Sequence, residues 1–330
     1  MVLGGTRFIG RRIVDELVEA GHDVLVVHRG QHEPHGLVDV PHLHADRLDL
    51  GVVQHDLVRF DPEAILDCAA FGAADADAVL GSFPRDDRRL VVLSSMDTYR
   101  AYGSLHAGTV TDALPLDETS PVRTDRFPYR GQMPGMDDYE KLEVEERWLA
   151  RGAAVCRLPM VIGEHDYQRR QELVLRRVRA GRTRIPIGAG TALLTHGYVG
   201  DVARGVRLVL EAGDATVAGE IFNFGERRTP SMALRARQIL EAAGASDDVE
   251  LVTVPDDALP PDLGILGSVP QHLLVSSDKA RAVLGWEESD PAESLRRTVE
   301  WHLANPPDDQ AGAVDFSLDE VALDRAVAIA

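Results

Sequence analysis

The sequence predicts an α/β fold, in which a doubly wound parallel sheet carries a smaller C-terminal α/β lobe. Up to about residue 160, short apolar runs alternate with helical patterns, which is typical of βαβ units. The chain opens on a very short apolar run, a glycine turn and a helical pattern, and beyond residue 160 the regular alternation ends. A chain of 330 residues that are 44% hydrophobic is long enough to bury a large core around such a sheet.

The first half of the chain supplies most of the expected sheet. The first helix is predicted at Arg11–Ala20, because Ile13, Leu17 and Val18 share one helical face and Gly21 is a stop signal. The strands are expected where short apolar runs lie between turn residues. They are Val2–Leu3, Asp23–Val27, His42–His44, Ala64–Asp67, Arg89–Leu93 and Ala154–Leu158.

Three regions follow from this pattern. Residues 1–160 form the sheet domain, with strand and helix contributions from later segments, and residues 161–304 form a lobe on the C-terminal edge of the sheet. Residues 305–330, which are rich in Pro and acids before a short apolar helix, are expected to be a peripheral tail. Within the lobe we expect short elements in Ile221–Gly225 and Asp278–Trp286, a helix over Met232–Ala243, and a loop that can act as a lid at Asp256–Gly267.

Composition excludes several classes of protein. The formal net charge of −19 argues against non-specific binding to a phosphate backbone, so we expect no nucleic-acid partner. Cys68 and Cys156 each lie in an apolar segment and are expected to be small core residues. The chain enters a strand directly, and no apolar run approaches membrane-spanning length. We therefore expect no membrane partner and a cytoplasmic location.

The glycine turn predicts a dinucleotide site, and residues 1–160 are therefore expected to be a Rossmann-type NAD(P)-binding domain. Gly4 and Gly10 match the first and third glycines of a GxxGxxG pattern, whereas Arg7 takes the middle position. Such a turn brings backbone N–H groups and a helix N-terminus close to a pyrophosphate. The expected cofactor contacts from the turn are Gly4, Gly5, Thr6, Arg7, Phe8, Ile9 and Gly10.

The end of the second strand bears on the choice of cofactor. His28 stands where an NAD-specific site offers an acid to the ribose 2′-hydroxyl. Arg29, together with Arg7, is predicted to clasp a 2′-phosphate, so NADP is favoured over NAD. In the alternative, Arg29 lies in solvent and Arg7 covers the turn without touching the ligand. Further expected contacts are Asp46 to the adenine amino group, with a solvated turn acid as its alternative, and the small Ala69 and Ala70 beside the cofactor.

Several further segments carry a resemblance to a known family. They are Val91–Tyr99, Lys141 with Glu145, Arg157–Gly163, Gly197–Ala203, Phe222–Gly225 and Ser277–Trp286. With the glycine turn they resemble the extended short-chain dehydrogenase/reductases of the NAD(P)-dependent epimerase/dehydratase type, over most of the chain. The turn Gly-Gly-Thr-Arg-Phe-Ile-Gly and the short link from Ala70 to Arg89 resemble an atypical branch that includes the chloroplast stem-loop RNA-binding proteins. Since most extended members have a longer connection there, with a dimerisation helix, both a monomer and a homodimer stay open.

The resemblance implies catalytic positions, of which one is displaced. In the family a Ser or Thr binds the substrate oxygen, a Tyr transfers its proton, and a Lys lowers the tyrosine pKa and binds the nicotinamide ribose. Ser95 and Lys141 match the first and last positions, but the YxxxK spacing places Asp137 where the tyrosine is expected. Tyr139 lies two residues before Lys141, and two such residues of one helix point about 200° apart.

Four arrangements are compatible with this spacing. The helix begins only near Tyr139, so that a turn redirects its phenol; another tyrosine, namely Tyr99, Tyr102 or Tyr129, reaches in from a loop; Asp137 is the acid/base; or proton transfer has been lost. We favour retained catalysis with a relocated acid/base, for which Tyr139 and Asp137 are the first candidates.

Contacts typical of nucleotide-sugar enzymes are weak. Met96 stands beside Asp97 where dehydratases carry paired acids, and Met160 and Leu194 replace the Asn and Arg usual for sugar nucleotides. The arginine-rich stretch Arg169–Arg182 either supplies pyrophosphate contacts or is a solvated helix face. His165 and His196 either touch substrate or are structural, and no clustered Cys, His and Asp spacing predicts a metal.

The expected function is that of an NADP-dependent oxidoreductase acting on a carbonyl or secondary alcohol of a small molecule. One alternative is a nucleotide-sugar epimerase or dehydratase with bound NAD(P). Another is a non-catalytic dinucleotide-binding or RNA-associated member of the atypical branch, which the acidic net charge disfavours.

Overall fold

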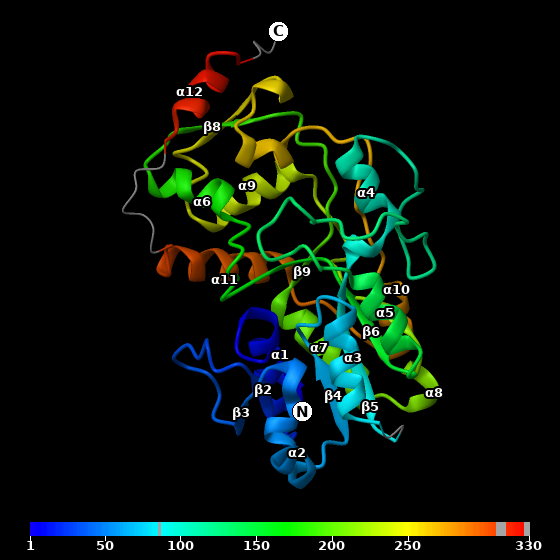
Figure 1. Cartoon of the computed structure of the whole chain (residues 1–330). Helices are drawn as coiled ribbons and strands as arrows, with labels where there is room; N and C mark the ends of the chain where they lie inside the picture. The colour runs from blue at the N-terminus through cyan, green and yellow to red at the C-terminus, as the bar shows by residue number, and fades with distance from the viewer. Residues whose placement is uncertain (85–86, 308–314, 327–330) are drawn as a thin grey trace.

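A seven-stranded parallel sheet forms the base of the molecule in the computed structural model, which describes residues 1–84, 87–307 and 315–326 (Figure 1). The strand order β10-β6-β5-β4-β1-β2-β3 runs outward from β1 in both directions, which confirms the predicted doubly wound sheet. The strands are β1 Val2–Leu3, β2 Val26–His28, β3 His42–His44, β4 Ala64–Asp67, β5 Arg89–Ser95, β6 Ala154–Leu158 and β10 Ile221–Asn223.

Helices cover both faces of this sheet, because its strands are apolar on both sides. Along β5, Val91 and Leu93 belong to one buried cluster and Leu90 and Val92 to another, as the two-residue period of a strand requires. The first cluster packs against α1 (Phe8–Glu19) and α7 (Val199–Glu211), and the second against α3 (Ala73–Ser82) and α5 (Lys141–Leu149). The short helix α2 (Gln54–Phe60) and the 3-10 helix η1 (Arg47–Val53) follow β3.

A third buried cluster forms the core of the upper lobe in Figure 1. This lobe contains two small parallel sheets, β8–β11 and β7–β9, and helices from several distant segments. Its elements are β7 Met160–Ile162, β8 Arg184–Ile187, β9 His196–Tyr198, β11 Glu250–Thr253, α4 Arg100–Ala107, α6 Glu172–Arg179, α9 Met232–Ala242, α11 Pro291–Ala304 and α12 Ser317–Leu323. The remaining short elements are η2 Met96–Thr98, α8 Asp214–Val217, η3 Asp256–Ala258, η4 Pro261–Leu266 and α10 Asp278–Leu284.

Some predicted boundaries differ from the structure. The first helix begins at Phe8 rather than Arg11, because the glycine turn leads directly into it. The second strand spans Val26–His28 rather than Asp23–Val27, since its neighbours β1 and β3 offer partners only to these three residues. The predicted loop Asp256–Gly267 contains η3 and η4, whose Leu263 and Leu266 are buried in the lobe core.

The C-terminal segment is attached to the lobe by buried charge. Asp319 of α12 accepts hydrogen bonds from the Arg177 guanidinium at 2.7 Å, and both side chains are about 2% exposed. Arg177 also contacts Asp262 of η4, so one guanidinium joins α6, α12 and the segment after β11. Among the described residues, no helix is both long and apolar enough to cross a bilayer.

Candidate functional site

The glycine turn lies at the carboxyl end of β1, where it enters α1. Gly4 has a φ of +82°, in the left-handed region that glycine adopts readily. A Cβ atom on Gly10 would lie 2.2 Å from the carbonyl oxygen of Gly4, so only glycine allows this approach of helix and turn. The predicted residues Gly4–Gly10 thus form one tight backbone unit at a helix N-terminus, which suits an anionic pyrophosphate. Ala69 follows β4 beside Gly4.

The two arginines of the predicted 2′-phosphate clasp lie in different surroundings. The guanidinium of Arg7 lies over the ring of Tyr167, with 4.6 Å between its central carbon and the ring centroid. Arg29 is exposed directly after β2. His28, at the end of β2, faces His42 and His44 of the neighbouring strand. Asp46 accepts a hydrogen bond from the backbone N–H of Leu48 and caps η1, in agreement with its reading as a turn acid, and its contact with adenine stays a prediction.

Lys141 lies buried between the carboxyl ends of β4 and β5. Its Nζ donates to the carbonyl oxygens of Ala70 at 2.6 Å and Leu93 at 2.9 Å. Burial lowers the pKa of this ammonium from its ordinary value, while Asp67 and Asp97 oppose the shift. The lysine is the first residue of α5, and its Nζ lies 5.8 Å from the ring centroid of Tyr139.

The start of α5 explains how Tyr139 and Lys141 come together. Glu140 is the N-cap of this helix, with an extended backbone (φ −152°, ψ 90°), and its side chain accepts from the N–H of Leu142. Tyr139 therefore lies outside the helix, so the 100° step per residue does not separate it from Lys141. This is the geometry of the first of the four arrangements compatible with the sequence, while Tyr129 of the second arrangement also reaches Asp97, and the identity of the acid/base stays a prediction. Asp137 is exposed, and its carboxylate accepts from the N–H of Gly131.

The phenol of Tyr139 meets a buried carboxyl group. Its OH donates to Oδ2 of Asp97 at 2.7 Å, and the OH of Tyr129 donates to the same oxygen at 3.0 Å. Tyr102 extends the chain, because its OH lies 2.8 Å from the OH of Tyr129. The Oδ1 atom of Asp97 is buried without a hydrogen-bond partner among the described residues. Ser95 lies two residues before Asp97 and accepts from its backbone N–H.

Burial controls the protonation of this group. It raises the pKa of Asp97 above the ordinary aspartate value, and the hydrogen bond from Tyr139 is the largest effect that opposes the shift. Burial, followed by the nearby charge of Asp97, raises the pKa of Tyr139 well above that of a free phenol. In this state Tyr139 is therefore a proton donor and Asp97 is an unusually basic carboxylate. From the sequence, Asp97 is expected only as one of the two acids that dehydratases carry at this place. Its contact with Tyr139 is not predicted from the sequence.

A buried ion pair holds the segment before α5 in place. The guanidinium of Arg123 binds the Glu140 carboxylate at 2.6 and 2.9 Å, and these side chains are 4% and 0% exposed. Arg123 also donates to the backbone carbonyl of Asp97 at 2.9 Å, and the Glu140 carboxylate accepts from the N–H of Phe127. The pair thus connects Asp97, Tyr139 and the start of α5.

Other predicted candidates have structural partners. Tyr99 is buried, and its OH donates to Asn223. His196 is buried with Nδ1 at 2.7 Å from the carbonyl of Leu194, and burial lowers its pKa well below the ordinary value. The ring of His165 packs against Trp301.

The arginines of the predicted arginine-rich stretch form ion pairs with acids of the protein, and the buried Arg177 departs from the alternative of a solvated helix face. The pairs are Arg170–Asp166, Arg176–Asp262, Arg177–Asp319, Arg179–Glu172 and Arg182–Glu320. A contact with pyrophosphate stays a prediction.

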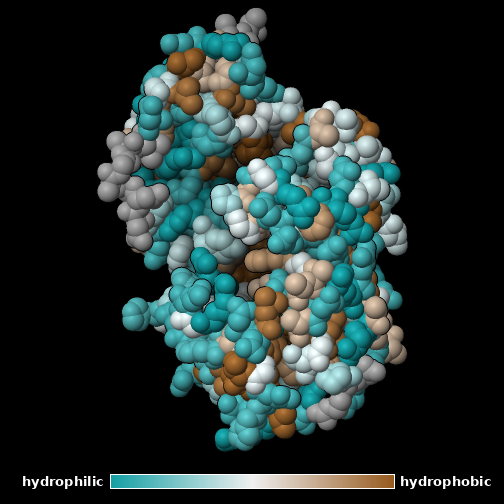
Figure 2. Space-filling view, viewed as in Figure 1, coloured by the Kyte–Doolittle hydropathy of each residue, from teal (hydrophilic) through white to brown (hydrophobic). Residues whose placement is uncertain are grey.

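The molecular surface is hollowed between the sheet domain and the upper lobe, and hydrophobic residues are visible in this hollow (Figure 2). The carboxyl ends of β1, β4 and β5 carry the glycine turn, the Ala70 carbonyl that binds Lys141, and Ser95. Ligands of open α/β sheets bind outside this edge. The arrangement can hold a dinucleotide beside a serine hydroxyl and a buried tyrosine–aspartate pair.

The chain matches a family model and is similar in sequence to known proteins. The model of the NAD dependent epimerase/dehydratase family matches residues 1–225. A chloroplast stem-loop binding protein of 41 kDa b from Arabidopsis thaliana is 26% identical over 345 residues, which cover 98% of this chain and 84% of the relative. The 2-alkyl-3-oxoalkanoate reductase of Stenotrophomonas maltophilia is 26% identical over 257 residues, or 74% of this chain and 76% of the relative.

Solved structures share the fold. A dTDP-glucose 4,6-dehydratase from Bacillus anthracis, in complex with NAD, superposes with a TM-score of 0.70 and 18% identity, over 92% of this chain and 96% of that one. A UDP-glucose 4-epimerase from Thermotoga maritima gives a TM-score of 0.68 and 21% identity, over 92% and 98% of the two chains.

Proposed function

The chain belongs to the NAD dependent epimerase/dehydratase family, and on that premise we propose that it is an NADP-dependent oxidoreductase of a small-molecule carbonyl or secondary alcohol. The observation that carries this proposal is the hydrogen bond of Tyr139 to Asp97, with Ser95 and Lys141 at the same edge of the sheet. Family membership makes the chain an NAD(P)-dependent enzyme, whereas NADP and the substrate class belong to the proposal.

The residues of the glycine turn fit a dinucleotide, because a Cβ at Gly10 would fill the space that the turn needs to approach the helix N-terminus. When bound, the nicotinamide supplies or accepts the hydride. Ser95 binds the substrate oxygen and Lys141 holds the nicotinamide ribose. Tyr139 gives its proton to the substrate oxygen during reduction and takes it back during oxidation.

Asp97 is the partner of Tyr139 in this proton transfer. When Tyr139 gives up its proton, the charge that develops on its oxygen lies 2.7 Å from Oδ2 of Asp97, so a carboxylate there would oppose the transfer. A protonated Asp97 instead donates to the phenolate and stabilises it. Because burial raises its pKa, Asp97 takes up a proton at a higher pH than an ordinary aspartate does.

The preference for NADP rests on the end of β2. His28 gives no carboxylate for a ribose 2′-hydroxyl, and Arg29 next to it is exposed and free to reach a 2′-phosphate. Because the guanidinium of Arg7 packs on Tyr167, we assign the larger share of this contact to Arg29.

A nucleotide-sugar epimerase or dehydratase is the second candidate, and Asp97 favours it because its carboxyl group lies beside the acid/base tyrosine. Against this candidate, the arginine-rich helix is paired with acids and offers no diphosphate contact in its present arrangement. Stem-loop binding, which the name of the Arabidopsis relative describes, would require cationic surface in a chain of net charge −19.

The test is a binding measurement followed by turnover. The purified chain is titrated with NADPH and NADH by nucleotide fluorescence, and then mixed with carbonyl, alcohol and sugar-nucleotide substrates while the reduced cofactor is followed by absorbance. We expect dinucleotide binding in the wild type and in Tyr139→Phe, with turnover of a carbonyl or alcohol only in the wild type. Failure to bind either dinucleotide would refute the cofactor site. Turnover that survives in Tyr139→Phe would refute the assigned acid/base.

A further inference from the structure

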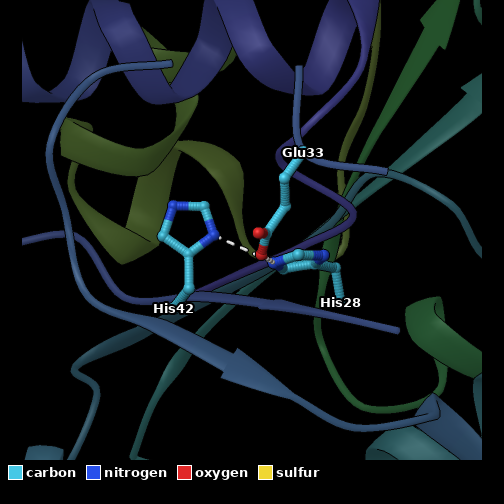
Figure 3. A group of neighbouring side chains, drawn as sticks. All are labelled: His28, Glu33 and His42. Atoms are coloured by element: carbon cyan, nitrogen blue, oxygen red, sulfur yellow. Dashed lines mark hydrogen bonds and ion pairs between the residues drawn. The ribbon is translucent and has the colours of Figure 1, made fainter. Parts of the chain in front are cut away.

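Three histidines and a glutamate gather at the end of β2, away from the tyrosine–aspartate pair. Strands β2 and β3 are parallel neighbours, with His28 opposite His44 and Val26 opposite His42. Residues two apart on a strand point to the same face, so both histidines of β3 can turn toward the ring of His28. Glu33 reaches the same point from the segment that connects the two strands (Figure 3).

The side-chain atoms of this cluster converge closely. Nε2 of His28 lies 2.9 Å from Nδ1 of His42 and 3.2 Å from Oε1 of Glu33, and the three ligand atoms all lie within 4.8 Å of one another. In a tetrahedral zinc site with bonds of 2.0–2.1 Å, neighbouring ligand atoms are roughly 3.4 Å apart. Small side-chain movements are therefore sufficient to place one ion among the three.

We propose that His28, Glu33 and His42 form a binding site for one divalent transition-metal ion of the zinc class. Two imidazole nitrogens and a carboxylate oxygen are the donors that such ions accept, whereas Mg²⁺ and Ca²⁺ prefer sites made wholly of oxygen. Nε2 of His44 lies 2.6 Å from Oε1 of Glu33 and supplies a fourth donor or orients the carboxylate. This site adjoins Arg29 of the proposed cofactor site, and its metal binding is measured separately from dinucleotide binding.

Burial and access also suit an ion. The side chain of His28 is 7% exposed and forms the floor of the cluster, whereas that of Glu33 is 44% exposed and leaves an entry path from solvent. With two neutral imidazoles and one carboxylate, the ligands neutralise one of the two charges of the ion, and the open side permits a water ligand.

The hydrogen bonds of the metal-free protein predict what binding must change. The N–H of Gly30 donates to Nδ1 of His28 at 3.2 Å, which leaves the proton of a neutral imidazole on Nε2. Coordination through Nε2 requires the proton to move to Nδ1, and the Gly30 peptide must then turn away. Gly30 is exposed and has a φ of +71°, a conformation that glycine adopts readily, so its peptide can reorient. The chemical shift of its amide should then change on metal binding.

No metal is predicted from the sequence, in which closely spaced Cys, His and Asp ligands are the signal of such a site. Positions 28, 33 and 42 are separated in sequence and become neighbours only through the pairing of β2 with β3 and the course of the connection between them. The proposal therefore departs from that expectation.

The test uses the full chain without a histidine tag, titrated with Co²⁺ and followed by its visible ligand-field absorption, with Zn²⁺ as the competitor. We expect about one Co²⁺ per chain, displaced by about one Zn²⁺, and a shifted or broadened Gly30 amide resonance in the ¹⁵N spectrum. His42→Ala and Glu33→Gln should each weaken Co²⁺ binding by about tenfold or more, by the scale of ligand-shell substitutions.

His32→Ala is the matched control, because His32 is an exposed histidine of the same connecting segment outside the cluster. It should bind Co²⁺ as the wild type does, and circular dichroism checks that every variant is folded. Equal Co²⁺ affinity in the wild type, His42→Ala and Glu33→Gln would overturn the proposal. So would the absence of a saturable Co²⁺ spectrum, whatever the outcome of the dinucleotide titrations.

Discussion

Removing the Arg123 guanidinium should destabilise the protein strongly and displace Tyr139. Arg123→Leu leaves the fully buried Glu140 carboxylate without its cation, although the N–H groups of Phe127 and Leu142 remain. Breaking a buried pair on one side costs about 3–5 kcal/mol, because an uncompensated charge stays in the interior. Arg123 also donates to the backbone carbonyl of Asp97, so its removal should also change the position of Asp97 beside Tyr139.

The assay is urea unfolding followed by tryptophan fluorescence and circular dichroism, from which the free energy of unfolding is obtained for each variant. Arg126→Leu is the control: Arg126 pairs with Glu146, and these side chains are 40% and 58% exposed. Such a surface pair contributes about 0–1 kcal/mol. The double variant Arg123→Leu/Glu140→Gln should recover part of the loss, because the buried charge is removed.

The pH dependence gives an independent check. Burial raises the pKa of Glu140, but the hydrogen bonds from Arg123, Phe127 and Leu142 together with the charge of Arg123 outweigh it, and the net pKa lies below the ordinary glutamate value of 4.5. The pair therefore contributes its full stability above pH 4.5, and this is lost as the pH falls through the lowered native pKa. The stability of the wild type should fall more steeply below pH 4.5 than that of Glu140→Gln. A cost below about 1 kcal/mol for Arg123→Leu, equal to that of Arg126→Leu, would refute this reasoning.

Three further predictions concern the cofactor and the acid/base. Arg29→Asp should weaken NADP binding by about 10- to 100-fold, which is the equivalent of a charge-assisted hydrogen bond, and should leave NAD binding nearly unchanged. The affinities are measured by fluorescence titration. Equal losses of affinity for NADP and NAD would show that Arg29 does not bind a 2′-phosphate. Gly10→Ala should abolish measurable dinucleotide binding, because its Cβ would lie 2.2 Å from the Gly4 carbonyl oxygen, whereas Gly81→Ala, with nothing near its Cβ, should bind normally. Asp97→Asn should lower the pKa of Tyr139, since it removes the negative charge beside a phenol whose pKa burial already raises, and the pH profile of turnover should shift to lower pH. An unchanged profile would exclude Asp97 as the proton partner.

The sheet could be predicted from sequence, because its signals are local. The apolar run at 89–95 has side chains in the two clusters on opposite faces of the sheet. A strand that is buried on both faces has a nearly continuous apolar sequence, so it can be recognised without tertiary information. The glycine turn is local as well, since its pattern follows from the left-handed backbone of Gly4 and the close approach of Gly10 to the Gly4 carbonyl. Lys141 and Ser95 were named only through the resemblance to a family.

The acid/base assignment depended on tertiary contacts. Whether Tyr139 and Lys141 share a helix is decided by the N-cap at Glu140, and that cap is fixed by Arg123, 17 residues earlier. No local propensity encodes this ion pair. The spacing could therefore show that the usual tyrosine position is taken by Asp137, but it left four arrangements open. The structure adds the geometry of Tyr139 and Tyr129 around Asp97, and the acid/base itself stays a prediction.

Lys141 shows what the sheet itself contributes to the site. An ammonium has three hydrogens, and two are directed at the carbonyls of Ala70 and Leu93. Only one donor remains, and its direction is set by the separation and twist of β4 and β5 rather than by the lysine's own rotamers. The two strands thus fix the direction of the third N–H of Lys141, which in the proposed function would donate to a ribose hydroxyl placed along that direction. A change in the core that alters the angle between these strands should therefore change cofactor affinity without touching a cofactor contact.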